Sequence, residues 1–134
     1  MSQYKFVLYA DDDVDDKDWV TDACKAVDGS LNMVFVENGR QVLDYLSGRS
    51  VHHLPSLIVL DLNMPEMDGR QTLQKLKSLP QYQAIPVAFV TTSTNHLDRE
   101  VCHRLGASIY LSKPDTHRAW QDIVRQLLPF VLNS

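Results

Sequence analysis

The sequence contains few of the features that mark several large classes of protein. It has only two cysteines, Cys24 and Cys102, which lie far apart, with no Cys-x-x-Cys pair and no histidine nearby at metal-ligand spacing. This spacing argues against a disulfide framework and against a zinc site. We therefore interpret both cysteines as packing residues of the interior.

Long apolar runs and an excess of basic residues are also missing. No run approaches the length that crosses a bilayer, and the first residues, MSQYKFVLYADDD, become acidic before a signal-peptide core develops. The 13 Lys and Arg residues are scattered and are outnumbered by 17 Asp and Glu, which gives a net charge of -4. Because nucleic-acid binding selects for clustered basic residues, we expect no direct contact with nucleic acid. The missing apolar run and signal peptide lead us to expect a cytoplasmic protein that does not bind membranes.

The residues that are present are typical of one globular domain. The 134 residues are 44% hydrophobic and 22% charged, which is enough for one sizeable core and too little for two comfortable domains. Short β-branched and aromatic runs, at 6–10, 33–36, 57–60, 87–91 and 108–111, alternate with segments of helical periodicity. The strongest of these segments are 19–27 and 120–131, and shorter ones lie around 42–46, 73–76 and 97–105.

Five strands that alternate with helices predict an α/β fold. The chain is expected to form a doubly wound (βα)5 domain, with a five-stranded parallel sheet and helices on both faces. The apolar runs LIVL and VAFV are typical of strands that are buried on both sides. The pattern alone leaves the strand order open, and 2-1-3-4-5 is one of the two common arrangements. In that order the first and third strands are neighbours, and ligands bind beyond the carboxyl ends of the strands.

Reactive or charged side chains follow four of the five predicted strands. These residues are Asp11, Asp12 and Asp13 after the first strand, Asp61 after the third, Thr91 and Thr92 after the fourth, and Lys113 after the fifth. Taken alone, an Asp-rich segment before a helix usually caps the helix, and we assign only that role to Asp15 or Asp16. For Asp13 we favour the start of the helix over an outer-shell place in a metal site.

The convergence of these groups on one edge of the sheet predicts a phosphoryl-transfer site. Neighbouring carboxylates repel one another unless a proton or a cation intervenes, and hard oxygen ligands on an open edge suit Mg²⁺. A metal ion and an ammonium group beside a carboxylate stabilise the outer oxygens of a phosphoryl group. Asp61 is then the attacking nucleophile, which forms an acyl phosphate.

In order and spacing, these residues resemble the receiver domains of two-component response regulators. The resemblance rests on ADDD at the end of the first strand, LIVLDLNMPEMDG, PVAFVTTS and YLSKP, and it covers nearly the whole chain. The stretches TTS and DDDVDD are similar to the single-domain, phytochrome-associated type. The resemblance implies a flavodoxin-like receiver fold with strand order 2-1-3-4-5 over residues 1–134, with no output domain.

The resemblance also implies a role for each site residue. Asp61 is the phosphoacceptor, and Mg²⁺ is held by Asp61, Asp11, Asp12 and the backbone carbonyl of Asn63. Thr91 donates its hydroxyl to the phosphoryl group, and Lys113 pairs with that group. Tyr110 matches a switch position whose ring swings inward with the Thr91 hydroxyl, and a fixed, half-buried aromatic is the alternative. The peptide bond from Lys113 to Pro114 is expected to be cis.

The implied function is regulation rather than catalysis on an external substrate. A sensor histidine kinase or a histidine phosphotransfer protein supplies the phosphoryl group, and the regulator signals by phosphorylation-dependent binding to a downstream protein. The only catalysis expected is its own phosphoryl transfer and autodephosphorylation. Alternatives are a pseudo-receiver that docks without phosphorylation, and a Mg²⁺-dependent aspartyl-phosphate hydrolase. The hydrolase class wants a second carboxylate two residues after the nucleophile, where this chain has Asn63.

The apolar end of the chain, LLPFVLNS, raises a separate question. Pro129 is expected to kink or stop the last helix, because proline cannot donate a backbone hydrogen bond. The apolar residues either pack on the core of the domain or contribute to a face for self-association, which would give a homodimer.

Overall fold

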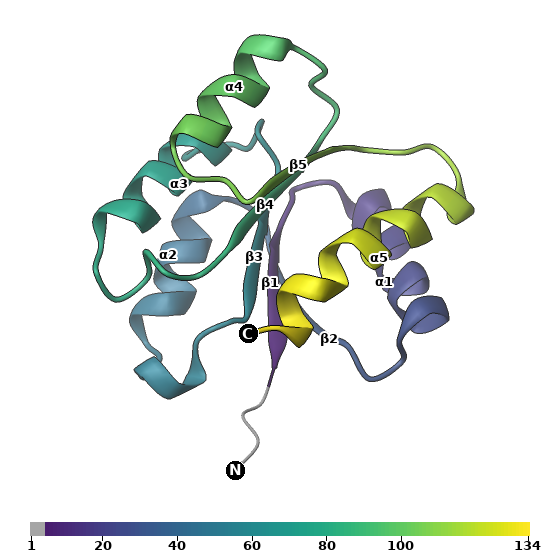
Figure 1. The fold of residues 1–134 in the computed structure, drawn as a ribbon, viewed down its shortest axis with the longest axis horizontal. Helices are drawn as coiled ribbons and strands as arrows, with labels where there is room; N and C mark the ends of the chain where they lie inside the picture. Colours follow the sequence, from purple (N-terminus) through teal and green to yellow (C-terminus); the bar gives the residue numbers. More distant parts are fainter. Residues whose placement is uncertain (1–4) are drawn as a thin grey trace.

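The structure, a computed structural model, describes residues 5–134 (Figure 1). One five-stranded sheet runs through the middle, its neighbouring strands all parallel, in the order β2-β1-β3-β4-β5. The strands are β1 (Phe6–Ala10), β2 (Asn32–Val36), β3 (Leu57–Leu60), β4 (Val87–Thr91) and β5 (Ile109–Ser112). The predicted fold class and strand order are confirmed. β2 begins one residue earlier than predicted, and β5 lies one residue later.

Helices cover both faces of the sheet. The helices α1 (Val14–Val27) and α5 (His117–Leu132) lie side by side on one face (Figure 1). The other face carries α2 (Gly39–Ser47), α3 (Gly69–Ser78) and α4 (His96–Arg104). A short 3-10 helix, η1 (Val51–His53), precedes β3 in a segment without helical periodicity. Within the described residues, none of the helices has the length and apolar character needed to span a membrane.

The three central strands are buried on both sides, as their unbroken apolar sequences predict. Along β1, Val7 and Tyr9 pack under α1 and α5, whereas Leu8 and Ala10 pack under the helices of the other face. Successive residues of a strand point to opposite faces, so one strand supplies both cores. The sheet is therefore a rigid support, and the groups at its carboxyl ends are held in fixed positions.

The two cysteines and the apolar end of α5 belong to these cores. Cys24 packs on the α1 and α5 side and Cys102 on the other, and both are free thiols. Burial raises the pKa of each thiol to about 11, which keeps both protonated and unreactive. Their predicted packing role is confirmed. Leu127 and Val131 are buried in the same core as Cys24, whereas Leu132 is 58% exposed, so the tail packs on the core in part, and its alternative role in self-association stays a prediction.

Pro129 was expected to kink or stop the last helix, and the second of these outcomes is wrong. α5 continues through Pro129 to Leu132, and the backbone N–H of Asn133 donates to the Pro129 carbonyl over 3.0 Å. Proline removes one donor inside the helix, but the last turn also carries Val131, which is 3% exposed. Tertiary packing of that side chain outweighs the unfavourable helix propensity of proline.

Gly69, the first residue of α3, provides a test of close packing beside the predicted site. A Cβ atom at this position would press on the Asp61 carbonyl oxygen and lie 2.7 Å from Phe89 Cε1. We expect Gly69→Ala to lower the free energy of unfolding by about 1–3 kcal/mol, as other overpacked sites do. Chemical denaturation measures the change.

Gly48, at the end of α2, is the matched control for this prediction. A Cβ atom at Gly48 would meet nothing within 4 Å, and its φ of -89° suits any residue. We expect Gly48→Ala to be neutral or to stabilise the protein by up to about 1 kcal/mol, because alanine restricts the unfolded chain. Equal stability of the two variants would show that the approach of α3 to Asp61 is not tight.

Candidate functional site

The ends of three strands bring the predicted site residues together. The backbone N–H of Asp61 donates to the Ala10 carbonyl over 3.2 Å, and that of Asp11 donates to Val36 over 3.0 Å. These bonds extend the ladder beyond the strands and fix both aspartates at adjacent strand ends. The N–H of Lys113 donates to the Thr91 carbonyl over 2.8 Å, which fixes the lysine at the end of β5.

The ammonium group of Lys113 lies at the centre of the site. Its Nζ is 2.7 Å from Asp61 Oδ2, to which it donates a hydrogen bond, and 3.0 Å from Asp11 Oδ2. A third carboxylate, from Asp16 on α1, lies 2.5 Å from the same Nζ. Burial opposes the charged form of Lys113, but the three carboxylates outweigh it and raise the pKa of the ammonium above its usual range. Lys113 therefore stays charged.

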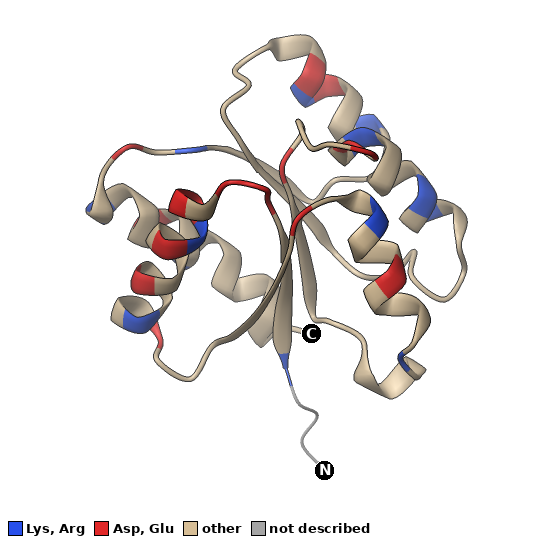
Figure 2. Ribbon diagram, turned by 180° about the vertical axis from the view of Figure 1, so that it is seen from behind, with Lys and Arg blue, Asp and Glu red and all other residues tan. Residues whose placement is uncertain are grey.

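Asp11, Asp12 and Asp61 form a group that fits a divalent cation. One carboxylate oxygen from each lies within 4.8 Å of the others, and Asp12 is exposed while the other two are buried. Figure 2 shows how acidic residues gather on the loop that enters α1 and on α1 itself. Hard oxygen donors with an open, water-facing side match the needs of Mg²⁺, which keeps several water ligands. The donor set thus fits the predicted cation.

The charge distribution of the site is unbalanced without a cation. The carboxylates of Asp11, Asp16 and Asp61 surround the Lys113 ammonium, and Asp12 adds a fourth carboxylate to the same region. Burial raises the pKa of Asp11 to about 6, against the opposing hydrogen bonds from the Asp13 N–H and Lys113. The charge of Asp61 acts in the same direction as burial and is a smaller part of this shift. A cation that binds to these oxygens would relieve this repulsion.

This raised pKa predicts how stability depends on pH when no cation is bound. The folded protein binds a proton at Asp11 more tightly than the unfolded chain, whose carboxyl has a pKa near 3.8. The resulting contribution to stability is complete below that value and is lost as the pH rises through about 6. In EDTA, the free energy of unfolding of the wild type should therefore fall relative to that of Asp11→Asn between these two pH values.

Thermal melts in EDTA at a series of pH values measure this difference. Asp44→Asn is the control, because Asp44 is an exposed carboxylate on α2, away from the site. Its stability should follow that of the wild type across the whole range. Parallel curves for the wild type and Asp11→Asn would contradict the assigned proton uptake.

The acidic run DDDVDD divides into residues with different roles. Asp13 is the N-cap of α1, and its carboxylate accepts hydrogen bonds from the N–H groups of Asp15, at 2.9 Å, and Asp16, at 3.4 Å. The predicted helix start at Asp13 is confirmed. Asp16 was predicted to serve only the helix terminus, but its side chain turns to Lys113 instead. Asp15 is exposed on the same turn.

Asn63 and Thr92 lie on the outer side of the site, and both are exposed. The N–H of Asn63 donates to Asp61 Oδ1 over 3.3 Å, so the loop after β3 holds the second oxygen of that carboxylate. Thr91 is fully buried, and its hydroxyl accepts a hydrogen bond from the Ser93 N–H over 3.4 Å. It thus lies one strand away from Asp61, at the end of β4.

Tyr110, on β5, contacts the loop that follows β4. Its ring is 5% exposed and packs against Phe89 at 5.9 Å between centroids, and its hydroxyl donates to the Ser93 carbonyl over 3.1 Å. The Arg99 guanidinium of α4 covers the ring at 5.4 Å. The ring therefore points inward, beneath the loop that follows Thr91.

The expected cis peptide between Lys113 and Pro114 is not found. No peptide bond among the described residues is cis. The lysine reaches Asp61 with a trans bond, because the backbone N–H of Lys113 is tied to β4 and its long side chain spans the remaining gap.

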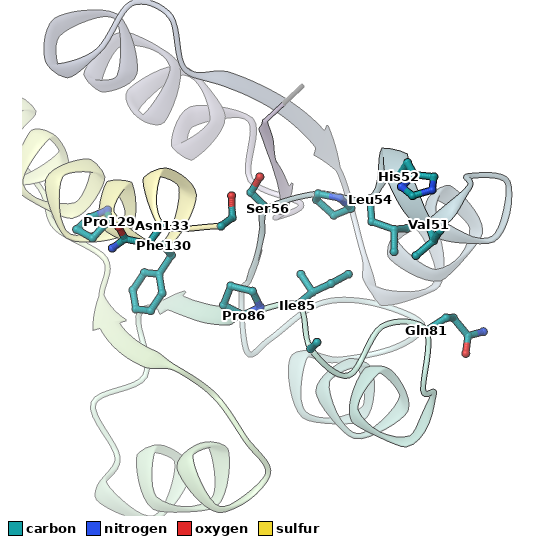
Figure 3. A pocket seen from close by; sticks show the side chains of 13 residues that line it. Val51, His52, Leu54, Ser56, Gln81, Ile85, Pro86, Pro129, Phe130 and Asn133 are labelled. Carbon is teal, nitrogen blue, oxygen red and sulfur yellow. The ribbon is translucent and has the colours of Figure 1, made fainter. Parts of the chain in front are cut away.

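A cavity of about 610 Å³ lies at the opposite end of the sheet. Figure 3 shows the Phe130 ring of α5 facing Pro86 and Ile85, with the segment around Leu54 and Ser56 on the other side. No side chain that lines it carries a carboxylate, ammonium or guanidinium group. A smaller hollow of about 310 Å³ borders Asp11, Asp12 and Lys17. Of these two hollows, the one with charged side chains is the one beside the carboxyl ends of the strands.

These features define a doubly wound α/β domain whose clustered carboxylates and Lys113 ammonium lie beyond the carboxyl ends of its strands, where such folds bind ligands. The chain belongs to the response regulator receiver domain family, whose sequence profile matches residues 7–125. The predicted family resemblance is confirmed. Receiver domains are in general signalling modules rather than enzymes that act on external substrates.

Individual relatives support this placement. The chain is 36% identical over 118 residues to the response regulator Rre1 of Synechocystis sp., which covers 86% of this chain and 49% of Rre1. It is 30% identical over 112 residues to the response regulator Rcp1 of the same organism, which covers 81% of this chain and 76% of Rcp1. The chain therefore spans about half the length of Rre1 and about three quarters of Rcp1.

Solved structures of two regulators have the same fold. The phosphorylated cyanobacterial phytochrome response regulator RcpA superimposes with a TM-score of 0.84 and 29% identity, over 96% of this chain and 94% of RcpA. The Mn²⁺-bound form of Rcp1 gives a TM-score of 0.79 and 28% identity, over 92% of this chain and 91% of that one. The predicted similarity to phytochrome-associated regulators is thus confirmed.

Proposed function

We propose that this chain is a response regulator that accepts a phosphoryl group on Asp61 in the presence of Mg²⁺. The observation that supports this most strongly is the position of the Lys113 ammonium, 2.7 Å from Asp61 Oδ2 and beside a carboxylate group that fits a cation. A sensor histidine kinase or a histidine phosphotransfer protein is the proposed donor. The output is a change in affinity for a downstream protein.

In the proposed reaction, an Asp61 carboxylate oxygen attacks the phosphorus of a phosphohistidine. The new O–P bond forms as the P–N bond breaks, and the departing imidazole nitrogen takes a proton from water. The product is an acyl phosphate on Asp61. Lys113, already beside this carboxylate, is placed to pair with a phosphoryl oxygen.

Asp11, Asp12, Asp61 and the Asn63 carbonyl would hold Mg²⁺. The bound ion would offset the negative charge of the attacking carboxylate and of the phosphoryl oxygens. The exposed side of Asp12 leaves room for water and for a phosphodonor. Rcp1, a relative with the same fold, has been solved in a Mn²⁺-bound form, which supports a divalent cation at this site.

Thr91 and Tyr110 are the proposed switch residues. A phosphoryl group on Asp61 would attract the Thr91 hydroxyl, which now contacts the Ser93 N–H. The Ser93 carbonyl also holds the Tyr110 hydroxyl, so a shift of this loop would reach the ring. The face formed by α4, β5 and α5 would then report phosphorylation to a partner, by a change in the population of two states.

Intact-mass measurement with acetyl phosphate tests the proposal. The wild type should gain the mass of one phosphoryl group in millimolar Mg²⁺ and should gain little in EDTA. No gain under either condition would favour the pseudo-receiver alternative. Rapid turnover of a generic phosphatase substrate would favour the hydrolase, against which the lack of a carboxylate side chain at position 63 already counts.

A further inference from the structure

Lys113 is held from two directions by carboxylates of different origin. Asp11 and Asp61 come from the ends of β1 and β3, at 3.0 and 2.7 Å from Nζ. Asp16 comes from the first turn of α1 and approaches Nζ at 2.5 Å. Only the first two belong to the group of carboxylates that fits a cation. Lys113 therefore contacts two carboxylates that also fit the cation, Asp11 and Asp61, and one that does not, Asp16.

The local structure of α1 leaves the Asp16 carboxylate free for this contact. Asp13 supplies the N-cap, so the Asp16 side chain is not needed at the helix terminus. Its side chain is 14% exposed, and among residues 5–134 its Oδ2 has no hydrogen-bond partner apart from its ion pair with Lys113. The buried hydroxyl of Tyr9 also lacks a hydrogen-bond partner within the described residues. Burial and the charges of Asp11 and Asp16 raise the pKa of Tyr9, so its hydroxyl stays protonated.

A divalent cation would change this balance of charge. Once it binds Asp11 and Asp61, their negative charge is offset and the cation itself repels the ammonium. Asp16 is then the one carboxylate in contact with Lys113 that keeps its full attraction for Nζ. Without it, the ammonium would be drawn toward solvent at the moment when a phosphoryl group arrives.

We propose that Asp16 is a positioning residue that keeps the Lys113 ammonium beside Asp61 while Mg²⁺ occupies the site. The role given to Asp16 rests on the proposed function, because the position of Lys113 matters only if Asp61 accepts a phosphoryl group. The contact between Asp16 and Lys113 can be tested without any phosphodonor. A failure of the contact and a failure of phosphorylation are therefore distinguishable.

Competitive acylation of lysine amines, read by peptide mass spectrometry, is the test. Exposed Lys25 serves as the internal standard in each sample. In millimolar Mg²⁺ at constant pH, Lys113 of the wild type should remain poorly labelled. Asp16→Asn should raise its labelling about tenfold, the effect of losing one close opposite charge. In EDTA the increase should be smaller, because Asp11 and Asp61 still hold the ammonium.

Two matched variants separate charge from structure. Asp15→Asn removes the same charge from an exposed side chain one residue away, and it should leave Lys113 labelling unchanged. Asp16→Glu restores the carboxylate and should bring labelling back toward the wild-type level. Circular dichroism identifies any variant that does not fold, and Asp16→Ser then replaces Asp16→Asn.

Three results would overturn the proposal. In the first, Lys113 is labelled in Asp16→Asn to within about twofold of its labelling in Asp15→Asn when Mg²⁺ is present. The loss of a close opposite charge should change the labelling by more than about twofold. Another is an increase of the same size in EDTA and in Mg²⁺, which would remove the link to the cation. The third is equal labelling in Asp16→Asn and Asp16→Glu, which would assign the effect to packing.

Discussion

Replacing Asp61 with asparagine should abolish phosphorylation of the chain. The amide has nearly the same size and can still accept the hydrogen bond from the Asn63 N–H, but it is not a nucleophile. We expect the rate of mass gain with acetyl phosphate and Mg²⁺ to fall by at least about 10³-fold, as when covalent nucleophiles are removed from other enzymes. Intact-mass spectra of both proteins, taken over the same time course, measure the loss.

Asp15→Asn is the control for this experiment, because it removes one carboxylate from the same acidic region without touching the site. It should be phosphorylated at nearly the wild-type rate. Undiminished phosphorylation of Asp61→Asn would remove Asp61 from the proposed role and direct attention to another carboxylate.

Mg²⁺ should stabilise the wild-type fold, because the cation binds the native carboxylate group and not the dispersed carboxylates of the unfolded chain. The gain is RT ln(1 + [Mg²⁺]/Kd), about 1.4 kcal/mol at roughly tenfold excess over Kd. Asp12→Ala should lose most of this gain. In EDTA the same variant should be at least as stable as the wild type, because repulsion from Asp11 and Asp61 is reduced.

Asp13→Ala provides a sharp control for this prediction. Asp13 accepts hydrogen bonds from the first turn of α1, so its loss should cost about 1 kcal/mol with or without Mg²⁺. Thermal melts of the three proteins in EDTA and in millimolar Mg²⁺ compare the two effects. A Mg²⁺-independent loss in Asp12→Ala would instead make Asp12 a helix-capping residue.

Most of the fold was predictable because its signals are strong and local. β3 reads LIVL and is buried along its whole length, and α5 combines an apolar stripe with a capping threonine at position 116. The strand order needed more than the pattern, since two orders satisfy it, and the family resemblance decided between them. Pro129 was misjudged because helix propensity ignores the burial of Val131.

The site was predictable where residues follow strands, and not where a helix contributes. Asp11, Asp61 and Lys113 directly follow strands, so their convergence at one edge follows from the parallel sheet alone. Asp16 lies in the first turn of a helix, where an aspartate ordinarily interacts with the helix dipole. With Asp13 as the N-cap, Asp16 occupies the third helical position, from which an acidic side chain can accept a hydrogen bond from the N-cap N–H. In the structure the Asp13 N–H donates to Asp11 Oδ1 over 2.9 Å instead, a choice that no sequence pattern indicates, and Asp16 contacts Lys113.

Locating the phosphoryl group on the chain is the most direct test of the account. Borohydride reduces an acyl phosphate to an alcohol, so an aspartate that carried the phosphoryl group is converted to homoserine. After treatment of the wild type with acetyl phosphate and Mg²⁺, peptide mapping should find this conversion at position 61 and nowhere else. Conversion of another aspartate, or none in a chain that has gained the mass of a phosphoryl group, would contradict the assignment of Asp61 as the phosphoacceptor.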